Sequence, residues 1–117
     1  ISTTNPNFFK NLTSLKTLLL GYNNYGMNLA RLSVRANEKL AVLDLSYNNV
    51  SEVPADYFSG LYSLRQINLT RNRISHFDID LTDLLSLVLL NLSYNAIKTL
   101  YPSMKTKIET FDEIPET

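Results

Sequence analysis

The sequence predicts a repeat solenoid: a right-handed β/α-type coil with a parallel concave sheet of four to five short strands and an irregular or 3₁₀ convex side. The first observation behind this prediction is a five-point apolar pattern around an asparagine that recurs along the 117 residues. The second is that apolar residues alternate inside each copy, as in a strand buried on one face. A unit repeated at a fixed period of roughly 20–50 residues indicates stacked coils.

The repeat is clearest in the stretch LAVLDLSYNNV, residues 40–50, which places Leu40, Leu43, Leu45 and Val50 around Asn48. Three further copies keep this spacing: Leu15, Leu18, Leu20, Asn23 and Tyr25; Leu64, Ile67, Leu69, Asn72 and Ile74; and Leu87, Leu90, Leu92, Asn95 and Ile97. The asparagines are separated by 25, 24 and 23 residues. This repetition is the strongest signal in the chain.

The second half of each cycle also follows a pattern. In residues 51–65, Val53, Pro54, Phe58 and Leu61 lead into Leu64. The pattern LxxLxLxxNxL resembles the leucine-rich repeat family over residues 9–114, and the second half is similar to its subtype of about 24 residues, xxLPxxxFxxLxxL. This subtype is common in extracellular proteins, including Toll-like receptors and adhesion proteins. The first repeat departs from the subtype, because it lacks the proline and the phenylalanine.

We expect residues 1–117 to form a single leucine-rich repeat segment of about four full repeats, with partial repeats at 8–14 and 98–117. Pro115 and Glu116 break the apolar register at the end of the chain. Neither end contains an obvious polar capping repeat, although stacked repeats need their end faces covered. The segment is therefore interpreted as a fragment of a longer solenoid.

Each repeat should contribute one short strand, near residues 17–20, 42–45, 66–69 and 89–92. The leucines point into the coil and the residues between them line a concave face. The return limbs of 12–14 residues show no sustained helical period. We expect short extended or 3₁₀ pieces there, and the limbs 29–37 and 103–111 are the best candidates for a helical turn.

The repeated asparagine has a structural explanation. The chain must turn sharply after each strand, which leaves inward-facing backbone groups without a partner in the sheet. A buried unpaired polar group costs about 1–3 kcal/mol, and an asparagine amide can both donate and accept hydrogen bonds. We therefore expect a structural ladder of stacked asparagines: Asn23, Asn48, Asn72 and Asn95.

The outward positions can be compared as columns across the repeats. One column before the ladder contains Tyr22, Tyr47, Arg71 and Tyr94, which should lie within reach for stacking and cation–π contact. The column either only shields the ladder from water or also contacts a ligand. The candidate protein-binding residues on the concave face are Lys16, Leu19, Tyr22, Val42, Asp44, Tyr47, Arg65, Asn68, Arg71, Leu89, Asn91 and Tyr94.

Several outward positions are apolar, which is unusual for a solvated sheet face: Leu19, Val42, Val88 and Leu89. A contiguous apolar surface with a charged rim indicates a partner. That partner is a protein ligand or co-receptor, a second copy of this chain in a homodimer, or a neighbouring part of a longer protein.

Four Asn-X-Ser/Thr sequences are candidate glycosylation sites, at Asn11, Asn49, Asn68 and Asn91. With thirteen asparagines and abundant Ser and Thr, two or three would arise by chance. Asn11 and Asn49 fall on a flank and a loop. Asn68 and Asn91 face the concavity, where a glycan would obstruct access.

The composition argues against nucleic-acid binding, catalysis and metal binding. The net charge is zero, with eleven basic and eleven acidic residues, so no global field attracts nucleic acid. The chain has no cysteine and one histidine, His76, which excludes thiolate catalysis and histidine clusters. The string FDIDLTD, residues 77–83, lacks the glycine and glutamate of a calcium loop. We expect no enzyme activity, metal, cofactor or membrane insertion in this segment.

The leading hypothesis is thus a non-catalytic protein–protein interaction module in an extracellular or cell-surface ectodomain. The alternatives are an architectural or self-association segment, and a cytoplasmic leucine-rich repeat scaffold or bacterial effector.

Overall fold

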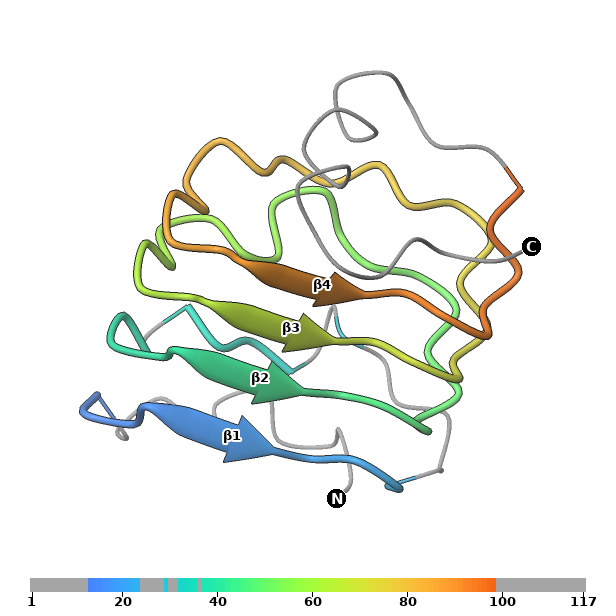
Figure 1. Ribbon diagram of the computed structural model, residues 1–117, viewed down its shortest axis with the longest axis horizontal. Coiled ribbons are helices and arrows are strands. Elements are labelled where there is room, and N and C mark those ends of the chain that lie inside the picture. The colour runs from blue at the N-terminus through green and yellow to red at the C-terminus, as the bar shows by residue number, and fades with distance from the viewer. Residues whose placement is uncertain (1–12, 24–28, 30–31, 36, 99–117) are drawn as a thin grey trace.

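The computed structural model describes residues 13–23, 29, 32–35 and 37–98. Within them lie β1 (Thr17–Leu19), β2 (Val42–Asp44), β3 (Gln66–Asn68) and β4 (Leu89–Asn91). They form one parallel sheet in the order β1-β2-β3-β4. Figure 1 shows the four arrows side by side and pointing the same way. The predicted solenoid with a parallel sheet is confirmed. The sequence repeat sets its register, because Leu18 pairs with Leu43, Leu43 with Ile67, and Ile67 with Leu90.

Each strand ends one residue earlier than its predicted range. The inter-coil hydrogen bonds nevertheless continue into the turn: Leu20 N donates to Asp44 O at 2.8 Å and Tyr22 N donates to Ser46 O at 2.9 Å. The same pair of bonds recurs between β2 and β3, and between β3 and β4. The strand direction changes here while neighbouring coils stay hydrogen-bonded.

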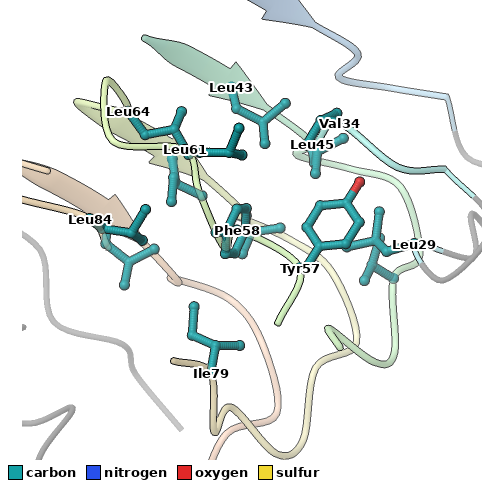
Figure 2. Close-up of a cluster of buried hydrophobic side chains, with 14 of the residues drawn as sticks. Leu29, Val34, Leu43, Leu45, Tyr57, Phe58, Leu61, Leu64, Ile79 and Leu84 are labelled. Atoms are coloured by element: carbon teal, nitrogen blue, oxygen red, sulfur yellow. The ribbon is translucent and has the colours of Figure 1, made fainter. Parts of the chain in front are cut away.

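The core lies between the sheet and the return limbs. Leu43, Ile67 and Leu90 point inward from the strand centres and are buried. Phe58 packs against them from the return limb, in edge-to-face contact with Tyr57 at 5.1 Å between ring centroids. Figure 2 shows Phe58 among Leu61, Leu64 and Leu84. Each coil thus buries its apolar residues against its neighbours, as in other stacked-repeat proteins.

The return limbs are built from tight turns. In residues 54–64, four N–H groups bond the carbonyl three residues earlier; they belong to Tyr57, Ser59, Leu61 and Leu64. Leu32 N likewise bonds Leu29 O in the limb 29–37, whereas the limb 103–111 falls outside the described residues. The Tyr57 hydroxyl donates to Leu32 O of the preceding coil, and burial raises the pKa of Tyr57. No helix in the described residues has the length and apolarity needed to cross a membrane.

The asparagines occupy the inner side of the turn after each strand. Asn72 Nδ2 donates to Leu69 O of its own coil and to Leu45 O of the preceding coil, both at 3.0 Å. Its Oδ1 accepts from Asn48 N at 3.0 Å and Val50 N at 2.9 Å. Asn48 and Asn95 repeat the double donation. One side chain therefore satisfies backbone groups of two coils.

Replacing Asn72 with alanine should cost at least about 3 kcal/mol of unfolding free energy, because several buried backbone groups lose their only side-chain partner. Asn68→Ala is the matched control, since Asn68 faces outward and accepts one hydrogen bond, from Thr70 N. Its expected cost is about 1 kcal/mol. Urea unfolding followed by circular dichroism measures both, and equal midpoints would contradict the ladder.

The Phe58 ring should contribute a large part of the stability that the core provides. Phe58→Ala is expected to lower the unfolding free energy by about 3–5 kcal/mol, the usual cost of removing a buried aromatic ring. Tyr62 is exposed on the same limb, so Tyr62→Ala should change stability by less than about 0.5 kcal/mol. A small effect of Phe58→Ala in thermal or urea unfolding would show that the limb is loosely packed.

Candidate protein-binding surface

The outward side chains of the strands form the surface that we call the sheet face: Thr17, Leu19, Val42, Asp44, Gln66, Asn68, Leu89 and Asn91, flanked at the strand starts by Lys16, Ala41, Arg65 and Val88. Parallel pairing places Val42, Gln66 and Leu89 side by side, and likewise Asp44, Asn68 and Asn91. Leu19 is 66% exposed and Val88 is 53% exposed. Apolar side chains are therefore open to solvent at both ends of the described sheet.

The column of Asp44, Asn68 and Asn91 has a structural role that was not predicted from the sequence. In each case Oδ1 accepts a hydrogen bond from the backbone N–H two residues later, in Ser46, Thr70 and Ser93 respectively, at 2.9–3.0 Å. This side-chain turn fixes the start of the exit from the strand. Only an acceptor oxygen is needed, which explains why both aspartate and asparagine occur in this column. Their short spacing to a following Ser or Thr is the signal that could have revealed it.

The exit column, defined as Tyr22, Tyr47, Arg71 and Tyr94, has an unusual backbone. All four residues have positive φ angles, between 57° and 63°. This left-handed conformation costs a non-glycine residue roughly 1–2 kcal/mol. The sequence carries no glycine at these positions, so nothing in it predicted the conformation. Because the same angle recurs in every coil, the four side chains leave the backbone in the same direction.

The side chains of the exit column contact one another in sequence order. The Tyr22 and Tyr47 rings are stacked, with centroids 4.1 Å apart and planes 14° apart. The Arg71 guanidinium carbon lies 3.9 Å from the Tyr94 ring centroid and 5.6 Å from that of Tyr47. The pKa of Tyr22 is raised, chiefly by its hydrogen bond with Tyr47. The contacts expected from the sequence are present, and they join four coils in one stack.

The stack is largely exposed to solvent. Tyr22 is 72% exposed and Tyr94 is 59% exposed, whereas the ladder residues Asn48 and Asn72 are buried. Tyr22, Tyr47, Asn49 and Arg71 line a shallow hollow. Much of the surface of the stack is therefore accessible.

The other residues considered for metal binding or catalysis do not form a site in the described part of the chain. No group of three or more His, Asp or Glu side chains that could hold a metal occurs among the described residues. His76 is exposed and lines a hollow on the return limbs with Glu52, Pro54 and Asp78. Asp80 forms a local turn instead of a cation site: its carboxylate accepts from the N–H and hydroxyl of Thr82, which lowers its pKa.

Of the candidate glycosylation sites, Asn11 lies outside the described residues. Asn49 is on the loop after β2, with φ 56°, and its Oδ1 lies 3.5 Å from Arg73 Nη1. Asn68 and Asn91 are half-buried on the sheet face. In the part of the chain that the structure describes, their Nδ2 atoms make no hydrogen bond.

The comparison with known families decides what kind of protein this is. A family model for the leucine rich repeat matches residues 38–97, more than half of the chain. The chain belongs to the leucine-rich repeat family. The matched range contains β2, β3 and β4 with their return limbs.

Relatives come from both animals and plants. The chain is 31% identical over 105 residues to lumican of Gallus gallus, an alignment that covers 88% of this chain and 29% of that lumican. It is 32% identical over 82 residues to fibromodulin of Oryctolagus cuniculus, covering 70% of this chain and 56% of fibromodulin. It is also 39% identical over 82 residues to disease resistance protein UNI of Arabidopsis thaliana, covering 70% of this chain and 9% of that protein. The chain thus spans less than a third of the Gallus gallus lumican and less than two thirds of the others.

The strain of the left-handed backbone in the exit column can be tested by substitution. Tyr47→Gly and Tyr47→Ala both remove the stacked ring, but only glycine adopts φ near 57° without strain. The glycine variant should therefore be the more stable by about 1 kcal/mol, despite the greater entropy of glycine in the unfolded chain. The same pair at Val42, inside β2, should show the opposite order. Urea unfolding checks both pairs, and an alanine variant more stable than glycine at position 47 would exclude the strain.

Proposed function

We infer that this segment is a non-catalytic protein-binding module of an extracellular receptor or adhesion ectodomain, and that its sheet face contacts a protein ligand. The observation that carries the proposal is the exit column: large aromatic and basic side chains, held by a repeated backbone conformation, whose surface is mostly exposed. Tyrosine and arginine are enriched among residues that dominate binding energy at protein interfaces. The concave sheets of stacked-repeat proteins serve as extended binding surfaces.

The extracellular location is supported by the resemblance to the subtype of about 24 residues and by the similarity to lumican and fibromodulin. The four candidate glycosylation sequences agree with it. The alternative is a cytoplasmic leucine-rich repeat scaffold. Secretion from animal cells followed by glycosidase treatment separates these locations, because a mass shift on deglycosylation requires passage through the secretory pathway.

The binding proposal is tested with photo-crosslinking side chains introduced into the full chain at Leu19 or, as a control, at His76 on the return limbs. Incubation with the medium and surface proteins of animal cells should label partners from position 19 and none from position 76. The double variant Tyr47→Ala with Arg71→Ala should reduce the labelling at least about tenfold, since each removes a side chain of the type that dominates binding energy at interfaces. Equal labelling from both positions, or no effect of the double variant, would refute the proposal.

Self-association is a second candidate function, favoured by the exposed apolar side chains Leu19 and Val88. Sedimentation equilibrium distinguishes it from ligand binding. A mass that rises with concentration, and that falls to the monomer value in Val88→Asp, would make this sheet face a dimer contact.

A further inference from the structure

The guanidinium of Arg71 is positioned by its neighbours, yet its hydrogen-bonding capacity is unused. Tyr94 lies against it at 3.9 Å and Tyr47 lies at 5.6 Å. Within the described residues, no hydrogen bond or ion pair involves the Arg71 side chain. The one ion pair found there joins Arg35 to Asp56 at 2.8 Å, on the return limbs. In the part of the chain that the structure describes, Arg71 is thus a positioned cation without an anion.

Stacking leaves the hydrogen-bonding edge of the guanidinium accessible. A guanidinium presents five N–H donors in its own plane, and an aromatic ring stacked on it covers only the face. Two parallel N–H groups match the two oxygens of a carboxylate, and such bidentate pairs are stronger than neutral hydrogen bonds. Holding the arginine between rings reduces the side-chain entropy lost when the anion arrives.

Among the described residues, no carboxylate pairs with Arg71. Asp44 is the one acidic residue on the sheet face, and its Oδ1 is committed to Ser46 N at 2.9 Å. Three basic residues lie on the sheet face and exit column (Lys16, Arg65 and Arg71), against the single acidic residue Asp44. Although the net charge of the chain is zero, this surface is locally positive and attracts an acidic partner.

The surroundings favour a protein over a sulfated polysaccharide. Beside the basic residues lie the exposed Val88, the half-buried Leu89 and the free amide nitrogens of Asn68 and Asn91. Apolar side chains and amides suit a polypeptide with apolar anchors, whereas a polysulfated chain would gain most from an unbroken basic surface. We propose that the partner's contact segment is acidic, and that an Asp or Glu side chain of this segment docks on Arg71 while an apolar neighbour contacts Val88 and Leu89. The inference rests on the proposed protein-binding function.

The test selects peptides from a random twelve-residue phage library on the full chain, then measures synthetic copies by fluorescence anisotropy. Selected peptides should contain Asp or Glu next to an apolar residue. Changing that acid to its amide, or Arg71→Gln, should each weaken binding about tenfold or more. Combining the two changes should cost little beyond either one, because they remove the same contact. Arg71→Lys, which keeps the charge without the planar fork, should give an intermediate loss.

Arg73→Gln is the matched control, because Arg73 is also exposed, lies two residues away and is absent from the stack. It makes the same charge change and should alter affinity less than about twofold. Unchanged thermal unfolding of each variant shows that the fold is retained. Heparin provides the competing arm: binding of heparin that is lost in Arg71→Gln, with no acidic peptide selected, would overturn the proposal.

A failure of the acidic-partner proposal can be distinguished from a failure of the protein-binding function. Peptides that bind the sheet face, with affinity reduced by Val88→Asp but not by Arg71→Gln, would refute the acidic partner and leave the protein-binding function standing. Peptides whose binding is affected by neither variant would refute both.

Discussion

The structure depends on how backbone groups are satisfied where each strand ends. A solenoid coil must leave the sheet at this point, and its carbonyl groups then face the interior, where an unpaired polar group is costly. Asn72 shows the solution: its amide bonds the carbonyls of Leu69 and Leu45, and its oxygen accepts the N–H groups of Asn48 and Val50. Cohesion between coils is therefore polar at the turn and apolar in the core.

The same turn determines what the surface can present. Asp44, Asn68 and Asn91 begin the turn with their side-chain oxygens, and the next exposed position adopts a left-handed conformation. Since neighbouring coils are in register, this position repeats at a spacing close to that of adjacent parallel strands, about 4.8 Å. Flat side chains placed there stack on one another. The exit column is thus a consequence of the backbone, and only its residue types are open to variation.

The sequence predicts more of the fold than of the surface. Period and alternation locate the strands, the buried leucines and the asparagines, because each depends on spacing alone. They do not predict the positive φ of Tyr47 or Arg71, since neither residue type favours that conformation. They also suggest Asp44 and Asn68 as ligand contacts, whereas the Oδ1 atom of each accepts a hydrogen bond in a local turn. A column of polar residues on a sheet can stabilise the chain or bind a partner, and only its hydrogen bonds separate the two roles.

The distinction between these two roles limits which residues of the surface can bind a partner. Side chains whose polar atoms complete the turn cannot rearrange for a ligand without a loss of stability, so Asp44 is a poor source of specificity. Arg71 differs, because its contacts are made by the face of the guanidinium and its donors form no hydrogen bond with any described residue. A partner carboxylate would add hydrogen bonds without breaking any in this chain, and the cost of positioning the cation is already met by folding. Specificity on this surface is therefore expected to come from the exit column, and the strands beside it supply apolar contact.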